Sequence, residues 1–131
     1  MSSRYSFEAG NGYMVIRIAG QYDYWDFIQY PKIIRTECEA LGIYRILVDV
    51  VAVTYIELPT LELFFLGEKV AEELRDRIKI ALVWHGGAGD NFLQTVAANR
   101  AASIRIFEST DTARIWLLYD HEDEPFNFLK S

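Results

Sequence analysis

Cysteine is almost absent from this 131-residue chain, because Cys38 is the only one. An internal disulfide is therefore impossible, which excludes a small secreted domain held together by disulfides. Basic residues are also in deficit, since 13 Lys and Arg face 19 Asp and Glu and leave a net charge of −6. This charge argues against binding to nucleic acid or to anionic membranes, both of which require a basic face.

Long apolar runs are missing as well. The first ten residues, MSSRYSFEAG, contain no apolar signal core. No stretch approaches the roughly 18 consecutive apolar residues that indicate a membrane span. We therefore expect no membrane insertion and a cytoplasmic location.

The spacings typical of metal and nucleotide sites are not evident. The two histidines, His85 and His121, show no metal-ligand spacing with each other or with Cys38, so no metal is predicted. The segment HGGAGDN lacks the Lys-Ser/Thr pair of a phosphate-binding loop, which favours a plain turn and predicts no cofactor. No nucleophile–base pair is visible either, and we predict no catalytic residue.

Apolar and aromatic residues are plentiful, at 51% and 15% of the chain. A chain of this length and composition can bury one substantial core without metal or disulfide support. We therefore expect a single domain over residues 1–131, in which 120–131 form an acidic C-terminal tail.

The apolar pattern predicts the order of the elements. Alternation on both sides of Asn11-Gly12 predicts two antiparallel strands joined by a tight hairpin. Buried strands are predicted at 44–53, 76–85 and 103–107, and helical periodicity appears at 23–42, 59–74, 90–100 and 109–120. In the first helical segment, Pro31 predicts a short initial turn and a helix that restarts near Tyr30. The order β-β-α-β-α-β-α-β-α predicts an α/β fold with a mostly parallel mixed sheet of about five strands and an N-terminal hairpin.

The helix predicted at 59–74 carries more apolar surface than one sheet contact needs. One stripe at helical spacing contains Leu63, Leu66, Val70 and Leu74. A second apolar surface, which ends at Glu68 and Glu72, contains Leu61, Phe64 and Phe65. The second surface either broadens the core contact or forms a dimer contact or a lipid-like groove.

Two other segments are candidate surfaces. The stretch YDYWDF places Tyr22, Tyr24, Trp25 and Phe27 at the entry to the first helix, and about half of these aromatic rings must belong to the core. Residues at and beyond the carboxyl-terminal part of the central predicted strand could line a site at the carboxyl end of the sheet, although capping or turn roles also account for them. These residues are Asp49, Tyr55, Glu57 and Thr60.

Several segments resemble the SpoIIAA-like branch of the STAS domains, whose fold is also compared with CRAL-TRIO lipid-binding domains. The matching segments lie within residues 5–119 and are RILVDV followed by LGEKVA, then IKIALV, FLQTVAANRAASIRIFEST and ARIWL. The resemblance implies a STAS-like fold and a non-enzymatic interaction module. In the better-known members, that module often antagonises an anti-sigma kinase.

The switch residue of that family does not match this chain. The family carries a phosphorylatable Ser in an Asp-Ser-Ser-Gly-type stretch at the start of the second helix. The corresponding positions here are Glu57, Leu58, Pro59 and Thr60, and Leu58 has no hydroxyl at the place of the phosphorylated Ser. Thr60, one or two positions displaced, is the remaining candidate for phosphorylation.

These observations lead to one expected function and one alternative. We expect a non-enzymatic STAS-like interaction and regulatory module that binds a protein partner or a second copy of itself as a homodimer, without the usual phospho-serine switch. The alternative is a carrier or sensor of a small hydrophobic, lipid-like ligand. The candidate partner or ligand surface contains Leu61, Phe64, Phe65, Tyr55 and Glu57.

Overall fold

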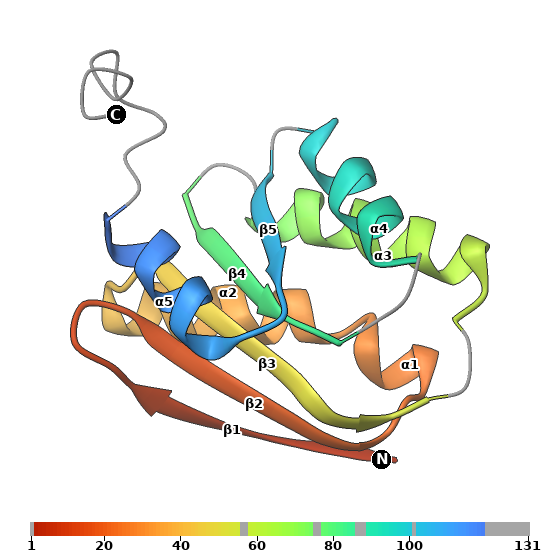
Figure 1. The fold of residues 1–131 in the computed structure, drawn as a ribbon, viewed down its shortest axis with the longest axis horizontal. Coiled ribbons are helices and arrows are strands. Elements are labelled where there is room, and N and C mark those ends of the chain that lie inside the picture. The colour runs from red at the N-terminus through yellow and green to blue at the C-terminus, as the bar shows by residue number, and fades with distance from the viewer. Residues whose placement is uncertain (1, 56–57, 75–76, 86–88, 101, 120–131) are drawn as a thin grey trace.

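The computed structural model of the chain contains one five-stranded sheet with helices on both of its faces (Figure 1). It describes residues 2–55, 58–74, 77–85, 89–100 and 102–119, with only the backbone described for 89–93. In chain order the elements are β1 (Ser3–Ala9), β2 (Met14–Gln21), α1 (Tyr24–Phe27), α2 (Tyr30–Leu41), β3 (Arg45–Thr54), α3 (Thr60–Leu74), β4 (Lys79–Val83), α4 (Gly89–Ala98), β5 (Ser103–Phe107) and α5 (Thr110–Tyr119).

The strands lie in the sheet in sequence order, β1-β2-β3-β4-β5. β1 and β2 pair antiparallel, and every later pair is parallel. The hairpin between β1 and β2 closes where Gly10 N–H donates to the Tyr13 carbonyl at 2.7 Å, and Gly12 adopts a φ of 88° that favours glycine. The predicted α/β fold, with a mixed sheet and an N-terminal hairpin, is confirmed.

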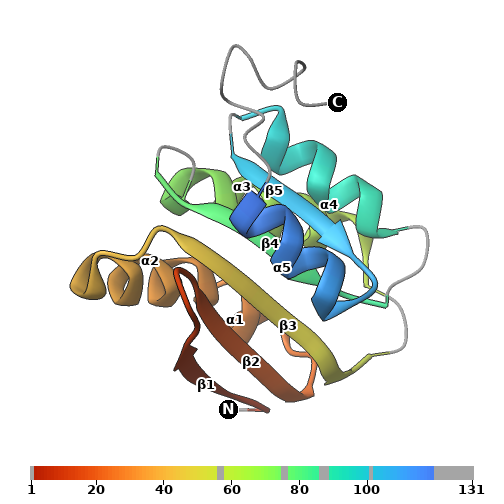
Figure 2. The same ribbon diagram turned by 60° about the vertical axis from the view of Figure 1, so that its left-hand side comes forward.

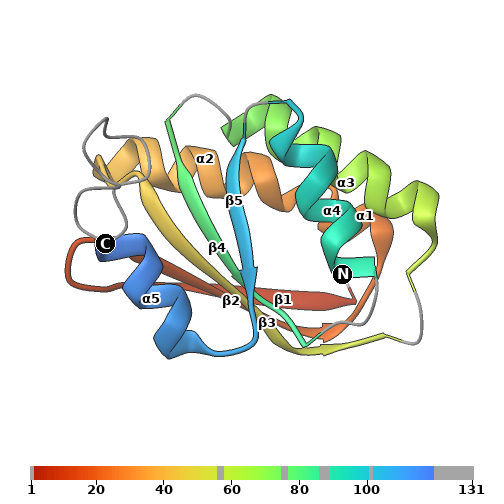
Figure 3. The same ribbon diagram turned by 45° about the horizontal axis from the view of Figure 1, so that its top comes forward.

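Helices α1 to α4 cover one face of the sheet and α5 covers part of the other, as Figures 2 and 3 show from two directions. On β3, Ile46 and Val48 belong to the core under α2 and α3, whereas Leu47 packs with α5. This alternation follows from the two-residue period of a strand. The larger core therefore lies between the sheet and α1–α4.

The first helical segment divides as its sequence predicts. α1 is a single turn, and the Asp23 side chain accepts from Trp25 N–H at 3.3 Å at its start. α2 begins at Tyr30 with Pro31 in its first turn, and Gly42 ends it with a φ of 68° while donating to the Cys38 carbonyl. Gly42 tolerates this left-handed backbone because it has no Cβ.

A bulge in β3 changes which residues face α1–α4. Arg17 pairs with Asp49, but Ala19 pairs with Ala52, so β3 has one more residue than β2 across this step. Without the bulge, Ala52 would follow Val48 on the inner face by strict alternation. The extra residue turns Val53 inward instead, where it is buried.

Among the described helices, none is long and apolar enough to cross a membrane. Several predicted features lie outside the described residues: the turn at 86–88, Glu57, His121 and the acidic tail. The side chain of Asp90, predicted to cap α4, is also outside them.

Candidate functional site

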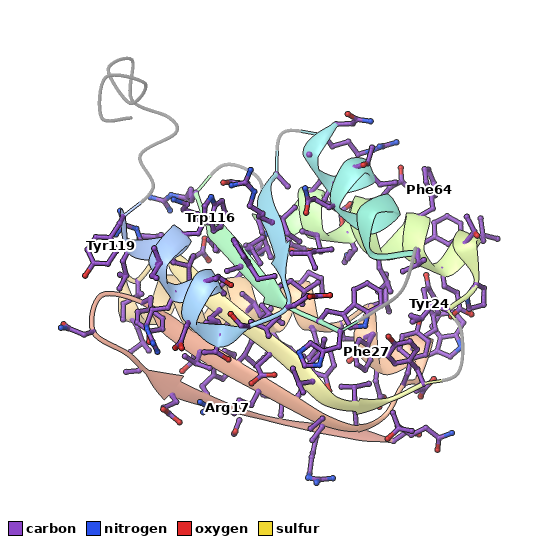
Figure 4. All side chains as sticks on the ribbon, in the orientation of Figure 1. Arg17, Tyr24, Phe27, Phe64, Trp116 and Tyr119 are labelled. Carbon is purple, nitrogen blue, oxygen red and sulfur yellow. The ribbon has the colours of Figure 1, made fainter. Side chains whose placement is uncertain are left out.

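Three exposed apolar side chains gather where α1 meets the first turns of α3. Trp25 is 71% exposed, Leu61 63% and Phe65 41%. All three line one surface groove together with Tyr24. Figure 4 labels Tyr24 near α1 and the start of α3. We call Trp25, Leu61 and Phe65 the α1–α3 patch.

The helical period of α3 places its apolar residues on two sides. Leu63 and Leu66 are 4% and 9% exposed and face the sheet. Leu61 and Phe65 are four residues apart, so they lie next to each other on the outer side. The second apolar surface predicted for this helix is therefore solvent-exposed at these two positions.

Phe64, the third residue of that predicted surface, has different neighbours. It is half-buried, and the Arg100 guanidinium lies 5.5 Å from the centre of its ring. Arg100 also pairs with Glu68 at 3.1 Å. Phe64 thus belongs to the contact between α3 and the segment after α4, although its ring also touches Phe65 with centroids 5.7 Å apart.

Asp26 holds α1 in place beneath the patch. Its carboxylate accepts from Ser2 N–H at 2.9 Å, from Ser3 N–H at 3.0 Å and from the Ser3 hydroxyl at 3.0 Å. The Ser3 hydroxyl lies 2.6 Å from the hydroxyl of Tyr30, so β1, α1 and α2 share one buried polar network. Burial alone would raise the pKa of Asp26, but the hydrogen bonds from Ser3 and Ser2 lower it below its ordinary value. No local pattern in the sequence marks Asp26 as a buried residue.

Two acidic groups lie beside the patch. Asp23 and Glu62 line the same groove as its apolar residues. The Tyr22 hydroxyl donates to a Glu62 carboxylate oxygen at 2.8 Å and ties the end of β2 to α3. Burial, followed by this hydrogen bond, raises the pKa of Tyr22 above its ordinary value, so the phenol stays protonated and acts as the donor.

The residues predicted after β3 separate in the structure. Tyr55 turns inward and its hydroxyl accepts from the Trp84 indole N–H at 2.9 Å. Thr60 is the exposed first residue of α3, and Leu58 before it is half-buried. Tyr55 therefore does not share the outer surface with Leu61 and Phe65.

Tyr55 instead lines an interior cavity of about 120 Å³ between the sheet and α1–α3, and this cavity is only partly enclosed. Its walls come from the inner face of β2–β5 and from the buried sides of the three helices, and they include Phe27, Val48, Leu63, Leu66 and Leu82. Tyr22, Tyr55 and Trp84 follow the ends of β2, β3 and β4, so they bound the cavity toward the carboxyl edge of the sheet.

Asp49 does not join this cavity. It lies on the opposite face of β3 from Val48, where its carboxylate accepts from Val51 N–H at 3.0 Å and lies 3.9 Å from Arg17. Figure 4 labels Arg17 on the sheet face that α5 covers only in part. The structure therefore does not bring Asp49 and Tyr55 into one site at the sheet edge.

The remaining candidate reactive groups lie on different elements, since His85 follows β4 and Cys38 lies in α2. A ring nitrogen of His85 is 2.7 Å from the Glu108 carbonyl, at the exposed end of β4. Cys38 is fully buried, and burial, followed by the charges of Glu37 and Glu39, raises the pKa of its thiol to about 11. Within the part of the chain that the structure describes, no group of three His, Cys, Asp or Glu side chains could hold a metal ion.

Comparison with known proteins identifies the fold. No protein-family model matches the chain, and no curated protein matches its sequence. An anti-sigma factor antagonist from Mycobacterium paratuberculosis has a similar structure, with a TM-score of 0.61 and 16% identity over 88% of this chain and 94% of that one. An uncharacterised DUF3478-family protein with a SpoIIAA-like fold from Shewanella loihica PV-4 gives a TM-score of 0.53 and 18% identity, over 88% of this chain and 93% of that one. The chain therefore has a SpoIIAA-like fold.

Proposed function

We propose that this protein is a non-catalytic interaction and regulatory module that binds a segment of a partner protein through the α1–α3 patch. The observation that carries this proposal is the joint exposure of Trp25, Leu61 and Phe65 in one groove. Aromatic side chains of this kind are typical anchors of protein interfaces. The similar fold of an anti-sigma factor antagonist supports a regulatory role.

The size of the patch fits a short partner segment. Trp25 and Phe65 are aromatic, with side-chain areas of roughly 150–250 Å², and Leu61 is somewhat smaller, so the three exposed fractions leave on the order of 300–400 Å² of apolar surface. A standard interface buries about 800 Å² on each partner, and obligate homodimers bury more. The patch is therefore suited to an amphipathic helix or an extended segment that inserts a few apolar anchors.

Charge favours a basic partner over a second copy of this chain. Asp23 and Glu62 flank the patch, and the chain carries a net charge of −6. A two-fold contact through this surface would bring like charges together, which opposes association. A segment with Lys or Arg beside its apolar anchors complements both features. The homodimer expected from the sequence is thus an alternative occupant.

The test compares two single substitutions. Phe65→Asp places a charge in the patch, and Ile115→Asp makes the same change at a 57% exposed position on α5. Proteins captured from source-cell extract by the wild type are purified, and their affinities for both variants are measured by calorimetry. We expect Phe65→Asp to weaken binding at least tenfold, a loss of about 1.4 kcal/mol or more, and Ile115→Asp to leave it unchanged.

Two results would contradict the proposal. Equal affinities of the wild type and Phe65→Asp for every captured protein would show that the patch is not the contact. A wild-type dimer in sedimentation velocity that Phe65→Asp dissociates would show that a second copy occupies the patch.

A further inference from the structure

The interior cavity is larger than ordinary packing defects. Protein cores pack as densely as organic crystals, and their voids seldom exceed the size of a water molecule. A water needs roughly 10–15 Å³ and two to four polar partners, whereas this cavity has about 120 Å³ and almost wholly apolar walls. Water is therefore a poor occupant for most of the space.

The polar atoms in the wall are already paired with other protein atoms. The Trp84 indole N–H donates to the Tyr55 hydroxyl at 2.9 Å, and the Tyr22 hydroxyl donates to Glu62 at 2.8 Å. An anionic ligand near Tyr22 would meet the Glu62 carboxylate, and any charged group in the cavity would lose its hydration without a partner. The walls therefore select against ions.

The volume limits the size of the occupant. An apolar cavity of about 150 Å³ in another protein stays dry and binds benzene, whereas pockets for drug-sized ligands span about 300–1,000 Å³. At about 120 Å³, the cavity matches a single ring or a short alkyl chain. A long acyl chain would have to extend beyond these walls.

We propose that this cavity is a binding site for a small, uncharged, hydrocarbon-like molecule of about the size of one aromatic ring. The site lies under the inner sides of α1–α3 and is separate from the outward-facing patch. The sequence suggests carriage or sensing of a hydrophobic ligand as an alternative function. The cavity supplies a location for that ligand and an upper limit on its size. Apolar contact with Val48, Leu66 and Leu82 supplies the recognition.

The probe for the test is toluene, with benzoate as its charged analogue and hexylbenzene as its long-chain analogue. We expect toluene to bind the wild type saturably and to raise its unfolding temperature. Benzoate and hexylbenzene should each bind at least tenfold more weakly than toluene. In the wild-type protein, nuclear Overhauser contacts from toluene should reach the methyl groups of Val48, Leu66 and Leu82.

A matched pair of variants locates the binding. Val70→Phe adds a ring at a half-buried wall position on α3 and should weaken toluene binding at least tenfold. Val51→Phe makes the same change at an exposed position on β3 that does not line the cavity, and it should leave the affinity unchanged.

Several outcomes would overturn the proposal. One is the absence of saturable toluene binding to the wild type, and another is toluene contacts that fall on methyl groups outside the cavity. Equal affinities for toluene and hexylbenzene would refute the size limit and indicate a long-chain occupant. If Val70→Phe does not fold, the wild-type methyl contacts alone decide the question.

Discussion

Leu61 and Leu63 provide a direct test of how α3 divides its apolar residues. The two side chains are identical and lie two residues apart, yet Leu61 is 63% exposed and Leu63 only 4%. Leu63 also lines the interior cavity, so its truncation enlarges a space that already exists. Substitution of each by Ala should therefore have very different consequences for the free energy of unfolding.

The magnitude for Leu63→Ala follows from burial. The truncation removes about three buried carbon groups, each worth about 0.8 kcal/mol of transfer free energy. The enlarged cavity adds a further cost, and measured Leu→Ala changes in cores span about 2.7–5.0 kcal/mol. We expect a loss of about 3–4 kcal/mol for Leu63→Ala and less than about 0.5 kcal/mol for Leu61→Ala.

Urea unfolding followed by circular dichroism measures both changes. With a slope of about 1–3 kcal/mol per M, Leu63→Ala should lower the midpoint by at least 1 M, whereas Leu61→Ala should barely move it. A Leu61→Ala loss above about 2 kcal/mol that depends on protein concentration would refute the reasoning, because it would mean that a second subunit covers Leu61 in solution.

Three further predictions concern single residues. The lowered pKa of Asp26 should stabilise the protein above the unfolded-state pKa of about 3.9, and this stability should be lost as the pH falls through the lower native value. Asp26→Asn should remove that part of the pH dependence of the urea midpoint. A variant with the same pH profile as the wild type would contradict this prediction. Gly42→Ala should cost about 1 kcal/mol in thermal unfolding, because the φ of 68° strains any residue with a Cβ while the space around it is open; a neutral effect would show that the α2 end relaxes. Cys38 should resist maleimide at pH 7 in the native protein and react in urea, because its native pKa is about 11; rapid native labelling, followed by mass spectrometry, would exclude the buried position.

The regular elements could be predicted because they depend on local patterns. The Asn11-Gly12 turn, the apolar runs of β3 and β4, and the periodicity of the helices all act over fewer than twenty residues. The excess apolar surface of α3 could be predicted for the same reason. Of its two interpretations, a dimer contact or ligand groove requires exposed side chains, and Leu61 and Phe65 are exposed. Trp25, in the aromatic segment identified from the sequence, is exposed too, whereas Phe27 lines the cavity.

The part that Val53 and Tyr55 play in the cavity wall could not be predicted, because it depends on the bulge in β3. Strict alternation from Val48 would have placed Ala52 on the inner face, whereas the extra residue brings Val53 and Tyr55 there. Nothing in the segment VDVVAVTY indicates at which residue the register shifts, since most of its side chains suit either face.

The burial of Asp26 could not be predicted for a different reason. An acidic residue in a one-turn helix is ordinarily exposed, because burying a charge without partners is costly. Here the partners are Ser2 and Ser3, more than twenty residues away in sequence, and they come within reach only after β1 has joined the sheet. Local patterns carry no information on such a contact.

The two proposed sites lie on opposite sides of the same helical turns. Leu63 and Leu66 form part of the cavity wall, while Leu61 and Phe65 form the outer patch on the same turns of α3. The Tyr22–Glu62 hydrogen bond joins a cavity residue to one at the rim of the patch. A molecule in the cavity changes the affinity of the patch for its partner if it shifts α3 to a position that the partner binds more tightly or more weakly. By thermodynamic reciprocity, the partner must change the affinity for that molecule by the same factor. Measurement of toluene affinity with and without a bound partner gives one side of this equality, and measurement of partner affinity with and without toluene gives the other.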